Sequence, residues 1–144
     1  MKFRLIIDQN KEEEIVATVK ERSPLIDHIQ NLVEEESDRL CGYLDNQIVK
    51  LDSRSVECIY VQDDKTYAVY EDGKTYRIKK RLYEIEESLP PSFIRINKSA
   101  IANSARIVRF ITTVTGGVNV EFGSGYTDYV SRRCFTQIKR RYGL

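Results

Sequence analysis

The chain has 144 residues, of which 41% are hydrophobic and 31% charged, and it carries a net charge of +1. These values indicate a small globular protein with a well-solvated surface. No apolar run approaches the roughly 20 residues that span a bilayer, and the first residues do not resemble a signal peptide. We therefore expect a cytoplasmic protein. Its three cysteines and single histidine are too scattered for a zinc site, so we expect no metal, no other cofactor and no disulfide.

The charges are unevenly distributed along the chain. Residues 1–44 hold 6 Lys/Arg and 10 Asp/Glu, a net charge of −4, whereas residues 45–144 hold 17 and 12, a net charge of +5. Within the second part, residues 93–111 and 129–144 contain basic residues and no acid. Two such stretches on one domain indicate a polyanionic partner, although a solvated basic face has the same pattern.

The first forty residues predict two strands and a helix. Apolar residues alternate in Lys2–Ile7, and the β-branched content of Glu14–Lys20 favours a second strand over a competing helix. Ser23-Pro24 is a helix start, with an N-cap serine and a first-turn proline. The apolar helical spacing fades in the acidic run that begins at Glu34. We expect a ββα unit over residues 1–41, which is also a candidate dimerisation or regulatory unit.

The character of the sequence changes near residue 42, where short β-like runs alternate with turn signals such as Asp45-Asn46, Asp63-Asp64 and Asp72-Gly73. The predicted strands are residues 40–44, 47–51, 58–61, 66–70, 75–78, 107–113, 118–122 and 126–130. The pattern predicts a mostly β domain over residues 42–144, and the whole chain belongs to the α+β class.

Two helices are predicted within this domain. Lys80–Ser88 has one apolar face and is ended by Pro90-Pro91, because proline cannot continue a helix. Ser131 is the predicted N-cap of a last helix that runs to about Arg141 and ends at Gly143.

Four segments, in this order, resemble the LytTR family of DNA-binding domains. Ile59–Tyr67 is similar to the first DNA-facing hairpin of that family, and Arg81–Glu86 to its short helix. Phe93–Asn103 resembles the core motif of the family, and Asp128–Phe135 resembles its C-terminal motif. The match covers about residues 42–144. It implies an elongated domain of short stacked sheets that grips DNA through loops and the start of the last helix, rather than through a helix-turn-helix.

The resemblance also implies a function and partners. The chain looks like a short-form transcription regulator that carries a small N-terminal extension in place of a receiver domain. Such a protein binds paired direct-repeat promoter sites in double-stranded DNA, and homodimerisation through the N-terminal unit is the economical way to occupy both. The resemblance further implies a small inhibitory membrane protein as a partner.

Carried over onto this sequence, the base-reading positions of the family fall on Tyr67, Asn97 and Arg133. An asparagine side chain can donate to and accept from adenine, and an arginine can donate twice to guanine. Some members of the family carry histidine where this chain has Tyr67, so stacking or a phosphate contact is equally compatible with that position. For phosphate contacts we expect Lys65, Lys98, Ser131 and Arg132.

Each base-reading residue also has a purely structural explanation. Tyr67 is one of nine tyrosines and would pack on a sheet face, Asn97 would bond the backbone of its own turn, and Arg133 would be a solvated helix charge. Two other classes of protein remain as alternatives. An enzyme is disfavoured because the only histidine, His28, lies in the acidic part with no nucleophile motif near it. A protein-interaction module that keeps the fold without binding DNA would be distinguished by a gel-shift titration.

Overall fold

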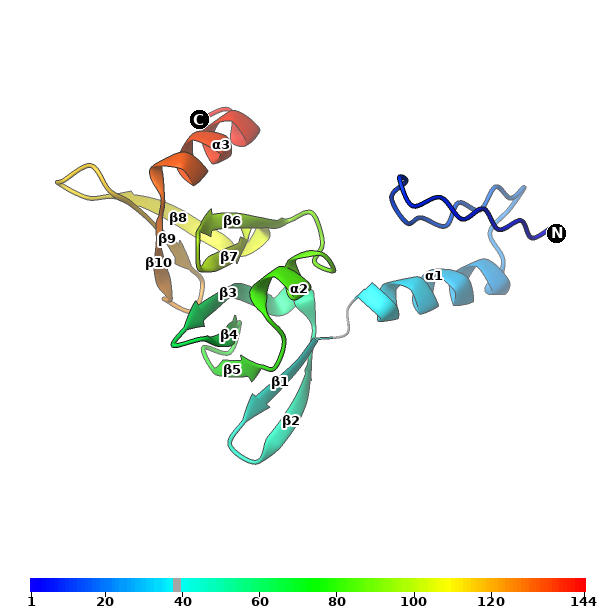
Figure 1. Ribbon diagram of the computed structural model, residues 1–144, viewed down its shortest axis with the longest axis horizontal. Coiled ribbons are helices and arrows are strands. Elements are labelled where there is room, and N and C mark those ends of the chain that lie inside the picture. Colours follow the sequence, from blue (N-terminus) through cyan, green and yellow to red (C-terminus); the bar gives the residue numbers. More distant parts are fainter. Residues whose placement is uncertain (38–39) are drawn as a thin grey trace. The chain divides into compact units, whose positions relative to one another are not determined.

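The computed structural model of the chain (Figure 1) describes residues 1–37 and 40–144. Residues 38 and 39, which lie beside the predicted domain boundary, are outside the described residues. Contacts between residues divide the chain into two units, Met1–Val33 and Glu34–Leu144.

The first unit contains the start of helix α1 (Pro24–Ser37), which begins at the predicted Ser23-Pro24 signal. The backbone N–H of Asp27 donates to the carbonyl of Ser23 at 3.1 Å, which closes the first turn. The two predicted N-terminal strands are wrong, because neither residues 2–7 nor residues 14–20 form a strand. Their apolar side chains lie in solvent, and Phe3 is 91% exposed. Alternation gives a segment the propensity for a strand, but a strand also needs a partner for its backbone and its apolar face.

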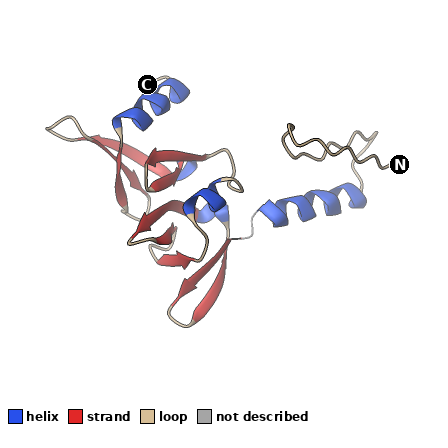
Figure 2. Ribbon diagram, viewed as in Figure 1, coloured by secondary structure: helices blue, strands red, loops and turns tan. Residues whose placement is uncertain are grey.

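The second unit is built on a seven-stranded antiparallel sheet with the order β2-β1-β5-β4-β3-β7-β6, and on a three-stranded sheet with the order β10-β9-β8. Figure 2 shows that strands predominate over helices in this unit. The strands of the large sheet are β1 (Leu40–Leu44), β2 (Gln47–Leu51), β3 (Val56–Gln62), β4 (Lys65–Tyr70), β5 (Thr75–Ile78), β6 (Phe93–Asn97) and β7 (Ala100–Asn103). Those of the small sheet are β8 (Ile107–Thr112), β9 (Val118–Phe122) and β10 (Thr127–Val130). The helices are α2 (Leu82–Glu86) and α3 (Arg132–Tyr142).

The α+β class is therefore confirmed, and so are the strands and helices predicted beyond residue 40. Their ends differ from the predicted ones by at most two residues. Turn chemistry explains this agreement. Asp63 and Asp64 both have positive φ, at 52° and 60°, which is the backbone of the tight turn that matches the twist of a hairpin. Gly143 ends α3 in the left-handed region with φ 65°.

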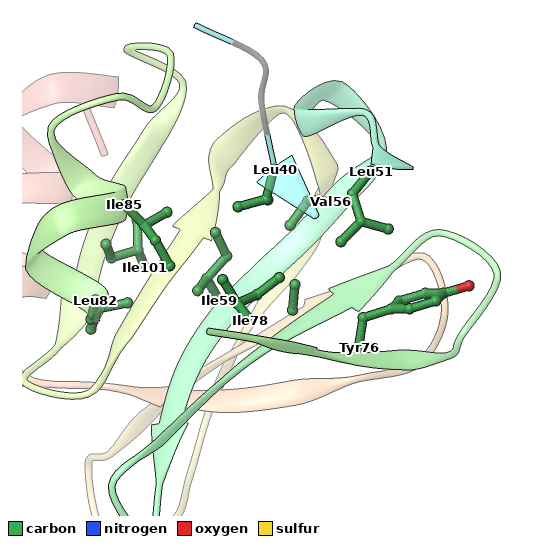
Figure 3. Close-up of a cluster of buried hydrophobic side chains, with 10 residues drawn as sticks. Leu40, Leu51, Val56, Ile59, Tyr76, Ile78, Leu82, Ile85 and Ile101 are labelled. Carbon is green, nitrogen blue, oxygen red and sulfur yellow. The ribbon is translucent and has the colours of Figure 1, made fainter. Parts of the chain in front are cut away.

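The large sheet has a hydrophobic core on each face, because side chains alternate along its strands. On one face Ile59 of β3 and Ile101 of β7 pack with Ile85 of α2. Figure 3 shows these side chains gathered beneath α2. On the other face Cys58 of β3 packs with Phe122 of the small sheet, and Ile138 of α3 joins the same cluster. We call these clusters the α2 core and the small-sheet core. Strands β3 and β7 contribute to both.

Two polar links fix the small sheet and α3 to the large sheet. The carboxylate of Glu57 is buried in β3, and it accepts a hydrogen bond from the backbone N–H of Ser124 at 3.0 Å and another from the Ser124 hydroxyl. A buried carboxylate is tolerated when such donors satisfy it. At the other end, the backbone N–H of Ser131 donates to the carbonyl of Ile96 at 2.8 Å. The start of α3 is therefore fixed to the end of β6.

The small-sheet core provides a direct test of this architecture. We expect Phe122→Ala to lower the free energy of unfolding by about 3–5 kcal/mol, because it removes a fully buried ring and leaves a cavity. Urea denaturation measures the change. Val114→Ala is the control, since that side chain is fully exposed in the β8–β9 turn and its loss should change stability by less than about 0.5 kcal/mol. Equal effects of the two substitutions would contradict the fold.

Candidate nucleic-acid interface

Three chain segments meet at one end of the second unit. They are the β3–β4 turn with Lys65, the β6–β7 turn at Lys98-Ser99, and the start of α3 at Ser131–Arg133. The backbone N–H of Val61 donates to the carbonyl of Ser99 at 2.8 Å, which joins the first two segments. The Ser131–Ile96 bond joins the second to the third. We call these three segments together the loop surface.

An open pocket lies beside the β6–β7 turn. Its volume is about 400 Å³, and its lining comes from β3, the end of β6, the β6–β7 turn, the β9–β10 turn and β10. The lining residues are Tyr60, Val61, Gln62, Asn97, Ser99, Tyr126, Asp128 and Tyr129. Among the residues that the structure describes, no group of three His, Cys, Asp or Glu side chains could hold a metal ion.

Asn97 does not project from the loop surface. Its side chain is only 3% exposed, and its Nδ2 donates to the carbonyl of Tyr129 at 2.9 Å and to Asp128 Oδ1 at 3.4 Å. Its Oδ1 accepts from the backbone N–H of Ser99 at 2.8 Å. The prediction that Asn97 reaches out toward base pairs is therefore wrong. The structural explanation, in which the side chain bonds its own turn, describes this geometry, and a register shift before Asn97 accompanies it.

Lys98 and the arginines at the start of α3 are exposed instead. Lys98 occupies the tip of the two-residue β6–β7 turn, and Arg132 and Arg133 lie in the first turn of α3. The predicted N-cap is confirmed, because Ser131 Oγ accepts a hydrogen bond from the N–H of Cys134 at 3.2 Å. The cap uses the oxygen as an acceptor and leaves the hydroxyl proton free to donate. The first turn of a helix also has amide groups without partners in the helix, which favours an anion there.

Tyr67 both packs and faces solvent. Its ring stacks on that of Tyr60 with centroids 5.5 Å apart, and Tyr60 stacks in turn on Tyr126 at 5.7 Å. Tyr67 remains partly exposed, one residue from the buried Thr66 and two from the exposed Lys65. Burial raises the pKa of Tyr60 and raises that of Tyr126 further. The Tyr126 hydroxyl therefore stays protonated and donates to Asp128 Oδ2 at 3.1 Å.

The basic stretch of residues 93–111 is largely neutralised by acids from other elements. Three of its four basic residues form ion pairs, with N···O distances of 2.8, 3.2 and 3.2 Å. These pairs are Arg95–Glu86, Arg106–Glu71 and Arg109–Glu121. The hydrogen bond from Arg95 lowers the pKa of Glu86. Within the described residues Lys98 has no ion pair, so the positive charge of this stretch is concentrated at the loop surface.

Sequence analysis did not identify three residues of the loop surface. Tyr129 is 54% exposed and lies two residues before the α3 cap. Gln62 and Ser99 are exposed at the two turns. The sequence did contain a signal for Tyr129, because an aromatic residue close to a basic helix start is a candidate contact for a nucleic acid. Gln62 and Ser99 had none, because only the pairing of β3 with β7 brings their turns together.

Cations and aromatic rings on turns and a helix start, held by a rigid two-sheet scaffold, are the features of a nucleic-acid-binding domain that contacts its target through loops. The LytTR DNA-binding domain family matches residues 46–143 of the chain. The chain belongs to this family. No helix in the described part of the chain is long and apolar enough to cross a membrane.

Similar proteins agree with this assignment. The chain is 30% identical to a protein of Staphylococcus aureus strain MRSA252 named as an uncharacterized HTH-type transcriptional regulator, over 100% of this chain and 99% of that protein. A counterpart in strain MW2 is 29% identical over the same shares. A solved LytTR DNA-binding domain of a Bacillus cereus response regulator superposes with a TM-score of 0.66 at 23% identity, covering 74% of this chain and 98% of that domain. The described residues of this chain contain no helix-turn-helix, because strands separate α1, α2 and α3.

The buried position of Asn97 leads to a measurable difference from its exposed neighbour. We expect Asn97→Ala to lower the free energy of unfolding in the absence of DNA by about 1–3 kcal/mol, because the Tyr129 carbonyl and the Ser99 N–H lose their partner. Lys98→Ala is the matched control and should change it by less than about 0.5 kcal/mol. Chemical denaturation monitored by circular dichroism gives both values. If both substitutions leave the free energy of unfolding unchanged, the buried, hydrogen-bonded position of Asn97 is contradicted.

Proposed function

We propose that this protein regulates transcription by binding specific sites in double-stranded DNA through the loop surface. The observation that carries the proposal is the linkage of the exposed Lys98 turn to the exposed arginines of α3. Two bonds hold them together, from Ser131 N–H to the Ile96 carbonyl and from Asn97 to the Tyr129 carbonyl. Family membership and the names of the relatives support it. Such a protein acts in the cytoplasm, and the proposal includes no catalytic step.

The contacts within the loop surface divide into two kinds. We assign base-edge contacts to Arg133 and to Lys98, because Lys98 is exposed at the turn where Asn97 is buried. A lysine ammonium can donate to the O6 and N7 atoms of guanine. Tyr67 contributes the exposed part of its stacked ring. Phosphate contacts are assigned to Lys65, Ser131 and Arg132.

Substitutions should separate these contact classes. We expect Lys98→Ala and Arg133→Ala each to cost about 1–3 kcal/mol on the preferred site and to relax the preference at one base pair. Arg132→Ala should weaken binding to all sequences alike and reduce the salt slope by about 1. Anisotropy titrations on a site selected from random DNA would measure both quantities. Arg140→Ala, in the last turn of α3, is the control.

Two results would count against this assignment. Equal losses on specific and random DNA for Lys98→Ala and Arg133→Ala would reject their base-reading role. Failure of the wild-type protein to shift any promoter fragment at low salt would reject DNA binding itself. The protein would then be an interaction module on the same fold.

We also propose that the protein binds direct-repeat sites as a homodimer that is joined through Met1–Val33. The support is the exposure of large apolar side chains in this unit, which a second copy would cover. The relative from strain MRSA252 aligns over its whole length, so its similarity extends to this unit. The predicted boundary after residue 41 lies inside β1, and Leu40 is buried in the α2 core. A deletion that tests the idea should therefore end at Val33.

Deletion of residues 1–33 should leave a folded monomer, because the α2 core and the small-sheet core remain intact. We expect binding to a two-repeat site to weaken at least tenfold, while affinity for a single half-site stays unchanged. Analytical ultracentrifugation and titrations on the two duplexes make the comparison with the full chain. An unchanged oligomeric state would show that this unit is not the interface.

A further inference from the structure

A row of side chains crosses the large sheet beyond the loop surface. In the strand register Tyr60 of β3 lies opposite Tyr67 of β4, Tyr67 lies opposite Arg77 of β5, and Arg77 lies opposite Tyr43 of β1. Residues in register on neighbouring strands point to the same face. With strands about 4.8 Å apart, the row is about 15 Å long. We call these four residues the tyrosine–arginine row.

The row lies on the same face as the small-sheet core, but that core covers only part of the face. The large-sheet members of the small-sheet core come from β3, β6 and β7, and none comes from β1, β4 or β5. Tyr43, Tyr67 and Arg77 are accordingly all partly exposed. On this face, β4, β5 and β1 therefore form a surface that the small-sheet core leaves uncovered. Tyr60 and Tyr67 lie where this surface adjoins the loop surface.

The row carries cations that the protein does not neutralise. In the part of the chain that the structure describes, the side chain of Arg77 makes no hydrogen bond or ion pair, and its Nε is buried without a partner. Lys79 places its ammonium 4.3 Å from the centre of the Tyr43 ring. Lys65 lies beside it at the start of β4, because Thr66 pairs with Ile78. The acids nearest to the row along the chain lie on turns, with Asp45 two residues after Tyr43 and Asp64 directly before Lys65.

The unpaired Arg77 side chain lowers the stability of the domain unless a bound anion accepts its hydrogen bond. A guanidinium held in a sheet with an unsatisfied N–H lowers stability, because the buried donor gives up water without gaining an acceptor. Arginine is well suited to phosphate through its planar set of donors, and a lysine over an aromatic ring keeps its charge available. A row of about 15 Å spans about four base-pair steps along the axis of the duplex, at about 3.4 Å of axis per phosphate of each strand.

We propose that the tyrosine–arginine row, with Lys79, is a second DNA-contacting surface that binds the phosphates flanking the bases read by the loop surface. This inference rests on the proposed function. The row adds affinity and fixes the orientation of the domain along the duplex, and it does not choose the sequence. We therefore expect the DNA segment protected by the protein to extend beyond the base pairs that Lys98 and Arg133 contact.

The test uses the full chain and a site selected from random DNA. We expect Arg77→Gln and Lys79→Gln each to weaken specific and random DNA by a similar factor of about 3 to 10, and to reduce the salt slope by about 1. Arg77→Lys keeps the charge and should keep most of the slope. Lys74→Gln is the matched control, because Lys74 is an exposed lysine on the β4–β5 turn at the opposite end of that hairpin from Lys65.

Duplex length supplies an independent readout. Shortening the flank on one side of the site should weaken wild-type binding, whereas the Arg77→Gln/Lys79→Gln variant should be insensitive to the same truncation. Lys79 is exposed, so Lys79→Gln remains informative even where Arg77→Gln unfolds the domain. If the wild type binds and neither substitution changes the slope, the row is not a DNA surface and the proposed function stands. If the wild type binds no DNA at low salt, both proposals are rejected.

Discussion

The hydrogen bonds of one buried amide, that of Asn97, set the geometry of the loop surface through which we propose that this domain binds DNA. The amide joins the β6–β7 turn to β10, and the neighbouring bond from Ser131 to Ile96 ties the start of α3 to β6, the strand that carries Asn97. The tip residue Lys98 and the helix residue Arg133 are therefore carried by one rigid unit. Reading base pairs requires donors placed within a fraction of an ångström, and flexible loops do not achieve this unless a second layer of contacts holds them. Asn97 supplies that layer.

The rest of the scaffold maintains this arrangement from below. The buried carboxylate of Glu57 fixes the far end of the small sheet through Ser124, and the stacked rings of Tyr60 and Tyr126 fill the space between the two sheets. Several charges outside the loop surface are neutralised, because acids form ion pairs with Arg54, Arg95, Arg106 and Arg109. Unpaired cations are then left where a polyanion would approach. Such a distribution steers the duplex toward one face of a protein whose net charge is only +1.

The hairpins, both helices of the second unit and the Ser131 cap were predictable from sequence, because glycine, proline, aspartate and serine act through local backbone chemistry. The N-terminal strands were not, since alternating residues around Phe3 and Ile15 describe a strand only where a partner covers them. Asn97 was misassigned for a similar reason. Its residue type suits a base and a turn equally, and only the tertiary contact with Tyr129 decides between them. The basic stretch of residues 93–111 indicated a positively charged surface, but the sequence does not show that acids distant in the chain, such as Glu86 and Glu71, lie beside its arginines in the folded domain.

The sharing of β3 and β7 between the two cores has a consequence for dynamics. Loss of either core removes the packing from one face of the same two strands and so weakens the sheet that supports the other core. We therefore expect the large sheet, the small sheet and α3 to unfold as one cooperative unit. Slow amide hydrogen exchange should therefore be centred on Cys58, Ile59 and Ile101, at the rate of global unfolding. The turns through which we propose that DNA is bound are tied to this unit by the bonds of Asn97 and Ser131, so we expect them to keep their arrangement until the whole unit unfolds.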